Sequence, residues 1–107
     1  MIEKLEALLA AGQDSAGIRF ALATHYLKEG NAPRAIDHAE VAVSLDANYS
    51  AAWRVLGQAQ VAAGRSEDAA QSFEQGIAAA RENGDRQVEK EMQVFLKRLR
   101  KPQDGRD

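Results

Sequence analysis

The chain has 107 residues, a length typical of one domain with a single hydrophobic core. It contains no cysteine, which excludes disulfide bonds, a catalytic thiolate and thiolate metal sites. The formal net charge of −2 hides an asymmetry, because residues 1–85 carry seven Lys and Arg against twelve Asp and Glu, whereas residues 86–107 carry seven against four. The body of the chain is therefore acidic and its end basic.

Composition and periodicity together predict an all-α protein. Alanine accounts for 21 of the 107 residues and proline for two, which favours closely packed helices over strands. Apolar residues recur at helical spacing between short segments that contain Gly, Pro or Asp. We expect six helices, followed by a disordered tail over 102–107, near residues 2–11, 15–29, 32–45, 48–63, 66–82 and 85–101.

The first predicted helix carries Leu5, Leu8 and Leu9 on one face, which we expect to be buried. Charged residues precede an apolar run of only five residues, shorter than the apolar region of a signal peptide. No segment approaches the roughly 20 apolar residues of a membrane span. We therefore expect a cytoplasmic protein that does not contact a membrane.

The next four predicted helices form two similar hairpins. A shift of 34 residues aligns 16–49 with 50–83 and superimposes helix faces, breakers and small residues. Four positions are identical in the two copies: Leu22 and Leu56, Gly30 and Gly64, Ala35 and Ala69, and Glu40 and Glu74.

Residues that end or begin helices separate the two members of each hairpin. Gly30 and Gly64 suit the left-handed turn that ends a helix. Pro33 suits the first position of the following helix, and Ser66 and Asp85 suit N-caps.

The second copy contains "WRVLGQAQ" at 53–60 and "AAQSF" at 69–73. These segments fit the patterns W-x₂-L-G-x₂-Y and A-x₃-F, except that Gln60 stands where Tyr is common. The chain therefore resembles tetratricopeptide-repeat proteins. The resemblance implies a right-handed superhelix of antiparallel helical hairpins. It also implies one domain over 1–101, made of a half repeat (1–14), two repeats (15–49 and 50–83) and a capping helix (84–101).

The single tryptophan lies within this pattern. We expect Trp53 and Leu56 to form a buried helix face, with Gly57 allowing the backbone of a neighbouring helix to approach closely. Ala69 and Phe73 on the following helix are expected to fill the other side of this contact.

Nothing in the sequence points to catalysis or to a cofactor. The serines lie mostly near helix ends, outside a G-x-S-x-G context, and the chain has no Gly-rich phosphate loop. His25 and His38, with Asp37 nearby, are compatible with a weak metal site, but ordinary packed or solvent-facing histidines explain them better. We therefore assign no catalytic residue, metal or cofactor.

The basic segment at the end of the last helix contains Lys97, Arg98, Arg100 and Lys101. Cations at a helix C-terminus interact favourably with the helix dipole, which is sufficient reason for their presence. Nucleic-acid binding would require a larger basic face with interleaved aromatic residues. We therefore expect no nucleic-acid partner.

In proteins of the family that the chain resembles, the first helix of each hairpin lines a groove that holds a partner segment. The resemblance implies that the same face of this chain is a mixed apolar and polar partner-binding groove, formed by Phe20, Thr24, Leu27, Lys28, Arg54, Gln58 and Val61. For Phe20 and Leu27, packing against a neighbouring helix is an equally good interpretation.

We therefore interpret the protein as a non-catalytic adaptor that binds another protein or peptide, with Lys28 and Arg54 favouring an acidic one. The alternative is a structural module that mainly associates with itself, since an acidic body and a basic end are able to join head to tail.

Overall fold

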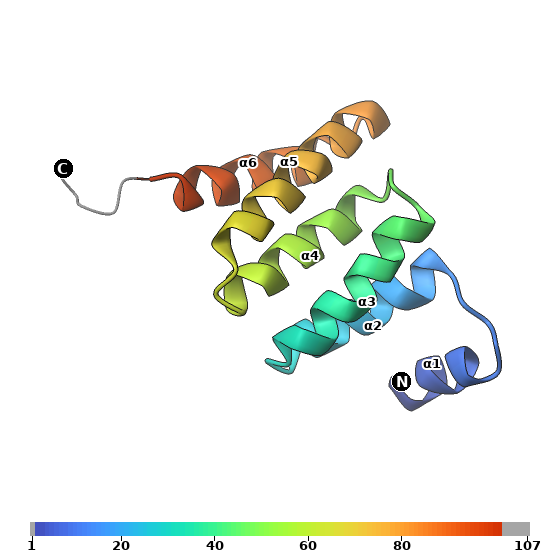
Figure 1. The fold of residues 1–107 in the computed structure, drawn as a ribbon. Coiled ribbons are helices and arrows are strands. Elements are labelled where there is room, and N and C mark those ends of the chain that lie inside the picture. Colours follow the sequence, from blue (N-terminus) through green and yellow to red (C-terminus); the bar gives the residue numbers. More distant parts are fainter. Residues whose placement is uncertain (1, 102–107) are drawn as a thin grey trace.

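The structure, a computed structural model, describes residues 2–101, and within this range it contains six α-helices and no strands (Figure 1). This confirms the predicted all-α class. The six helices are α1 (Ile2–Ala10), α2 (Ala16–Lys28), α3 (Ala32–Leu45), α4 (Ser50–Ala62), α5 (Ser66–Asn83) and α6 (Arg86–Leu99). The tail over 102–107, predicted to be disordered, lies outside the described residues.

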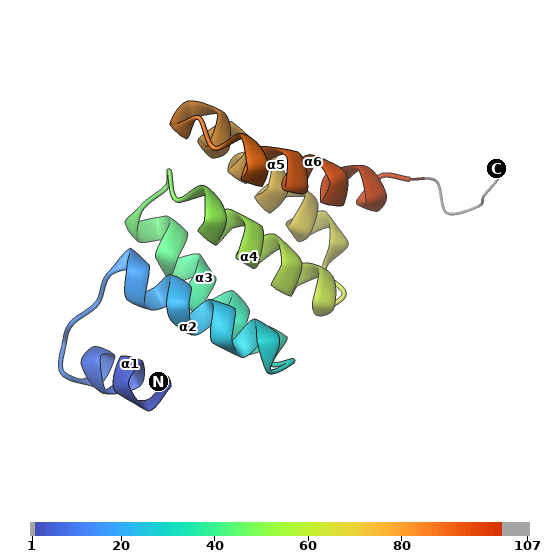
Figure 2. The same cartoon turned by 180° about the vertical axis from the view of Figure 1, so that it is seen from behind.

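The helices form two layers. Figure 2 shows α2, α4 and α6 side by side on one face, whereas α3 and α5 lie on the opposite face in Figure 1. Within residues 2–101, α4 contacts helices of both layers, whereas the backbones of α3 and α5 do not come into contact. The α3 and α5 helices therefore both pack on α4 and not on each other.

The helix ends mostly follow the sequence prediction. Gly30 and Gly64 each have a φ of 78°, the left-handed conformation expected after α2 and α4. The Oδ1 atom of Asp85 accepts a hydrogen bond from the Val88 amide at 3.4 Å, which confirms the N-cap of α6. Pro33 occupies the second position of α3, not the first.

The predicted N-cap at Ser66 is wrong. Ser66 is the first residue within α5, and Arg65 takes the N-cap position without a side-chain hydrogen bond to the helix. Arg65 instead forms an ion pair with Asp68 in the first turn, with an Nη2–Oδ2 distance of 2.9 Å. Since acidic residues near a helix N-terminus are favourable, Glu67 and Asp68 compensate in part for the absent cap.

Two hydrophobic clusters make up the core. The first joins α2, α3 and α4 and is built largely from buried alanines, and the second joins α5 and α6 around Phe73, Ile77 and Met92. Trp53 packs against both clusters, although its side chain is only partly buried. The Trp53 Nε1 atom donates a hydrogen bond to the Ala47 carbonyl at 2.8 Å, which fixes the orientation of the ring.

The contact at Gly57 differs from the prediction. A Cβ atom at position 57 would lie 2.3 Å from Cε1 of Phe73, so the phenyl ring of Phe73 packs directly on the glycine. The group that approaches Gly57 is therefore a side chain of α5 and not the backbone of a neighbouring helix. Gly76 has the same role between α5 and α6, since a Cβ there would lie 2.4 Å from Sδ of Met92.

The first helix is less buried than expected. Leu5, Leu8 and Leu9 are half-exposed, because α1 packs on α2 and on no other helix within residues 2–101. In a complete hairpin the second helix packs on the first helix of the same hairpin. Within residues 2–101 there is no such helix before α1.

A polar cluster joins α1, α2 and α3 around the ring of Tyr26. The Tyr26 hydroxyl donates to the Glu6 carboxylate and accepts a hydrogen bond from Nη1 of Arg34 at 3.3 Å. The ring of His38 stacks on that of Tyr26 with centroids 5.6 Å apart. Nη1 of Arg19 lies 3.0 Å from Nδ1 of His38, and a guanidinium can only donate, so Nδ1 accepts. The hydrogen bond to Tyr26 raises the pKa of Arg34.

We expect Gly57→Ala to destabilise the protein by about 1–3 kcal/mol, because the new methyl group overlaps the buried Phe73 ring. Gly17→Ala is the matched control, since Gly17 is exposed within α2 and its nearest neighbour would be Oγ of Ser15 at 4.0 Å. The control should change the stability by no more than about 0.5 kcal/mol, because Gly17 is exposed in the first turn of α2. Urea unfolding measures both, and similar shifts in the two variants would contradict the packing described for Gly57.

Stability is expected to fall as the pH drops below about 6.5, the ordinary pKa of histidine. Burial, followed by the nearby Arg19 guanidinium, lowers the pKa of His38 in the folded protein. The unfolded chain therefore binds a proton at a higher pH than the folded chain, so stability is fully present above about 6.5 and is lost as the pH falls towards the folded pKa.

Urea unfolding between about pH 7.5 and pH 5.5 measures this loss, which should be smaller in His38→Gln. Proton NMR of the His38 ring provides an independent check. A folded-state titration of His38 at or above its ordinary pKa would contradict the expectation.

Candidate functional site

The candidate groove residues lie on α2 and α4, in the layer that Figure 2 shows in front. The structure divides them into two groups according to their contacts. The residues on α2 mostly pack or form hydrogen bonds within the protein, whereas those near the C-terminal end of α4 line a pocket.

On α2, Phe20 and Leu27 are partly buried and pack against the first core cluster. The ring of Phe20 lies 5.0 Å from that of Tyr49, and burial raises the pKa of the Tyr49 hydroxyl. Thr24 donates its hydroxyl to the Phe20 carbonyl at 2.9 Å. Phe20 and Leu27 therefore make the packing contacts that the second interpretation expects, and each keeps part of its side chain exposed.

The two cations of the candidate groove differ in their surroundings. Arg54 is half-buried and forms an ion pair with Glu91 of α6, with an Nη1–Oε1 distance of 2.5 Å. Lys28 is exposed and makes no ion pair with any residue of 2–101. Because the charge of Arg54 is already compensated, it attracts an acidic ligand less than the sequence alone indicates.

Gln58 and Val61 line a pocket of about 260 Å³ together with Phe73 of α5 and with Phe95, Arg98 and Leu99 of α6. Val61 is 43 % exposed. Val94 of α6 is 48 % exposed. This end of the face therefore combines an apolar pocket with accessible aliphatic side chains, as protein-binding surfaces often do.

The contribution of α6 is what the sequence analysis missed. We expected α6 only to cover the last hairpin, yet it supplies Phe95, Arg98 and Leu99 to the pocket and Val94 to the adjoining surface. The available signal was the position of α6, because a helix that follows a complete hairpin occupies the place of another first helix.

Basic side chains surround this part of the surface. Lys97, Arg98 and Lys101 adjoin Val94 and make no ion pair with any residue of 2–101. Arg100 forms an ion pair with Glu74 of α5. Uncompensated positive charge is therefore concentrated at the C-terminal end of α6, beside the pocket, whereas the first hairpin contributes Lys28.

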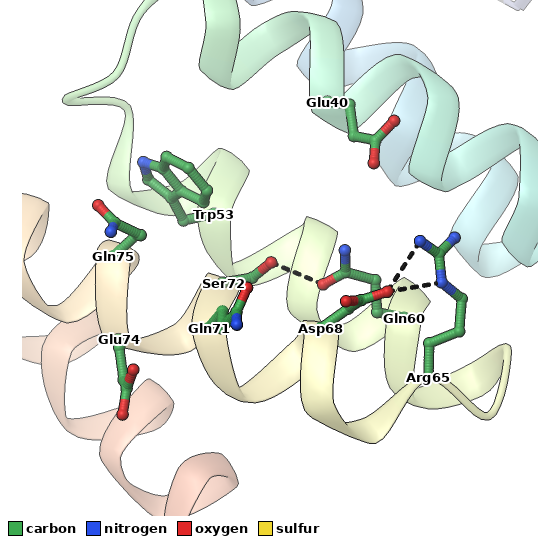
Figure 3. A pocket seen from close by; sticks show the side chains of 9 residues that line it. All are labelled: Glu40, Trp53, Gln60, Arg65, Asp68, Gln71, Ser72, Glu74 and Gln75. Carbon is green, nitrogen blue, oxygen red and sulfur yellow. Dashed lines mark hydrogen bonds and ion pairs between the residues drawn. The ribbon is translucent and has the colours of Figure 1, made fainter.

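A second, polar pocket of about 460 Å³ lies on the opposite layer, between α3 and α5 (Figure 3). Its lining residues are Glu40, Trp53, Gln60, Arg65, Asp68, Gln71, Ser72, Glu74 and Gln75. Ser72 donates its hydroxyl to Oε1 of Gln60 at 2.6 Å, and both residues are buried.

Both histidines contact the ring of Tyr26. The ring centroid of His25 is 5.3 Å from that of Tyr26, in an edge-on arrangement, and His38 stacks on the same residue. Within residues 2–101, no three His, Asp or Glu side chains are grouped so as to hold a metal ion. In the same range, no helix is both long enough and apolar enough to cross a membrane.

Comparison with known proteins identifies a matching family and several relatives of this chain. A family model described as tetratricopeptide repeat matches residues 26–88. A TPR repeat-containing protein of Pseudomonas aeruginosa is 50 % identical over 99 residues, which cover 92 % of this chain and 94 % of the relative.

Solved structures agree with the sequence matches. A Bordetella parapertussis protein superimposes with a TM-score of 0.79 at 42 % identity, over 92 % of this chain and 86 % of its own. A tetratricopeptide repeat domain protein from Salinibacter ruber superimposes with a TM-score of 0.73 at 33 % identity, over 79 % and 96 %. The paired helices, the breaker glycines and these similarities together lead to one conclusion: the chain belongs to the tetratricopeptide-repeat family.

Proposed function

We propose that the protein is a small adaptor that binds an acidic segment of another protein in the groove between α4 and α6. Tetratricopeptide repeats generally mediate protein–protein interaction and are generally not catalytic, which supports the class of function. The observation that carries the finer proposal is the apolar pocket between Val61 and Phe95, with the uncompensated Arg98 at its edge.

The pocket suits one apolar side chain of the partner. Phe73, Phe95 and Leu99 provide its apolar wall, and Gln58 provides an amide for a backbone group of the bound segment. Arg98 and Lys97 favour acidic residues next to that apolar anchor, and the positive charge also accelerates the encounter.

The groove residues expected on α2 have a secondary role in this proposal. Lys28 remains available to the far end of a bound segment, whereas Phe20 and Leu27 contribute mainly to packing. Arg54 keeps Glu91 and α6 in position. The binding surface therefore centres on Gln58 and Val61 among the residues expected from the sequence.

The variant Arg98→Glu should weaken binding of the partner by about tenfold, because it replaces attraction of acidic residues by repulsion. Arg86→Glu is the matched control, since Arg86 is exposed at the other end of the same helix and does not line the pocket. Its affinity should stay within about twofold of the wild type.

The partner is first captured from a cell lysate with the wild-type protein and identified by mass spectrometry. Fluorescence anisotropy then measures the affinity of a labelled segment of that partner for each variant, at two salt concentrations. Equal affinities for Arg98→Glu and the wild type would contradict the proposal that the partner binds in this groove. Capture of further copies of the chain alone, lost at high salt, would favour the self-association alternative.

A further inference from the structure

The 34-residue repeat relates two inter-helix spaces that differ in their contents. In the first space, between α1 and α3, Glu6 supplies a carboxylate, Tyr26 a ring and Arg34 a guanidinium. The Cζ atom of Arg34 lies 5.5 Å from the centroid of the Tyr26 ring. In this space the Arg34 guanidinium therefore interacts with the Tyr26 ring and hydroxyl, and that hydroxyl in turn donates to the Glu6 carboxylate.

The second space, the polar pocket between α3 and α5, keeps the carboxylate but has an acidic residue at the position equivalent to Arg34. Glu40 stands 34 residues after Glu6, and Asp68 stands 34 residues after Arg34. The aromatic ring is supplied by Trp53, whose indole lies beside the pocket in Figure 3. Arg65, the cation among the lining residues, forms an ion pair with Asp68, and Glu40 makes no ion pair with any residue of 2–101.

A buried polar group in the pocket also lacks a partner. Gln60, which stands 34 residues after Tyr26, is only 4 % exposed. Its Oε1 atom accepts from Ser72, but no other residue of 2–101 bonds to its N–H₂ group. Figure 3 shows this amide directed towards the α3 side of the pocket. Because an unpaired buried donor is costly, this group calls for an acceptor within the pocket.

We propose that this pocket binds an arginine side chain presented by an extended segment of a partner protein. The guanidinium pairs with the Glu40 carboxylate and lies against the Trp53 indole, while the N–H₂ group of Gln60 donates to a backbone carbonyl of the same segment. Arginine fits better than lysine, because a planar guanidinium can stack on an indole and bond to a carboxylate at once. The site uses the opposite helix layer from the acidic-segment groove, so it goes beyond the function proposed above.

The probe for this site is the peptide acetyl-Gly-Arg-Gly-amide, titrated to ~10 mM into ¹⁵N-labelled protein, a range that detects millimolar dissociation constants. Trp53 is the single tryptophan, so the indole N–H signal reports on the pocket without ambiguity. We expect saturable shifts of this signal and of the Gln60 side-chain amide. A peptide with citrulline in place of arginine, which has a similar shape without the charge, should bind about fivefold more weakly.

The variant Glu40→Gln removes the carboxylate at an exposed position that makes no ion pair within residues 2–101, so the fold should be retained. It should weaken binding of the arginine peptide by about fivefold. Glu82→Gln is the matched control, since Glu82 is exposed on α5 and does not line the pocket. Its affinity should remain that of the wild type.

Three results would overturn the proposal: shifts that do not saturate at Trp53 and Gln60, equal binding of the arginine and citrulline peptides, or equal weakening in the two variants. None of these results depends on the groove between α4 and α6, so the two sites are tested separately.

Discussion

The packing of the Phe73 ring on Gly57 is the contact on which the second half of the molecule depends. Phe73 is completely buried, and a Cβ atom at position 57 would lie much closer to its ring than van der Waals contact allows. The same ring interacts with that of Phe95 at a centroid distance of 5.4 Å. One side chain of α5 therefore sets the positions of α4 and α6 relative to each other, and with them the shape of the apolar pocket.

The first half of the molecule is held together differently. Its core is made mostly of alanine, and polar and aromatic groups around Tyr26 join α1, α2 and α3. In the second copy, Gln60 stands at the position equivalent to Tyr26. The two copies therefore share a backbone arrangement but have an aromatic side chain and an amide at the same place. One inter-helix space is thereby filled from within the chain and the other is left as a polar pocket.

Ion pairs between helices orient α6 more than they stabilise it. Arg54–Glu91, Arg81–Glu89 and Arg100–Glu74 connect α6 to α4 and α5, and all three are partly or largely exposed. Exposed pairs of this kind each contribute at most about 1 kcal/mol. Their main consequence here is electrostatic, because they neutralise Arg54 and Arg100 and leave Lys97 and Arg98 as the uncompensated cations of the groove.

The sequence by itself determined the helix class, the six helices, the repeat and the glycine turns, because helical periodicity and left-handed turns are local properties that residues such as Leu22 and Gly30 encode. It also indicated that Gly57 has a packing role. Only the tertiary structure decided that Phe73 occupies that contact, that Phe20 packs against Tyr49, and that Arg54 pairs with Glu91. Only the tertiary structure, likewise, brought Phe95 and Arg98 beside Val61. These contacts join residues far apart in the chain, and the distance between two helices depends on the sum of all the side chains packed between them.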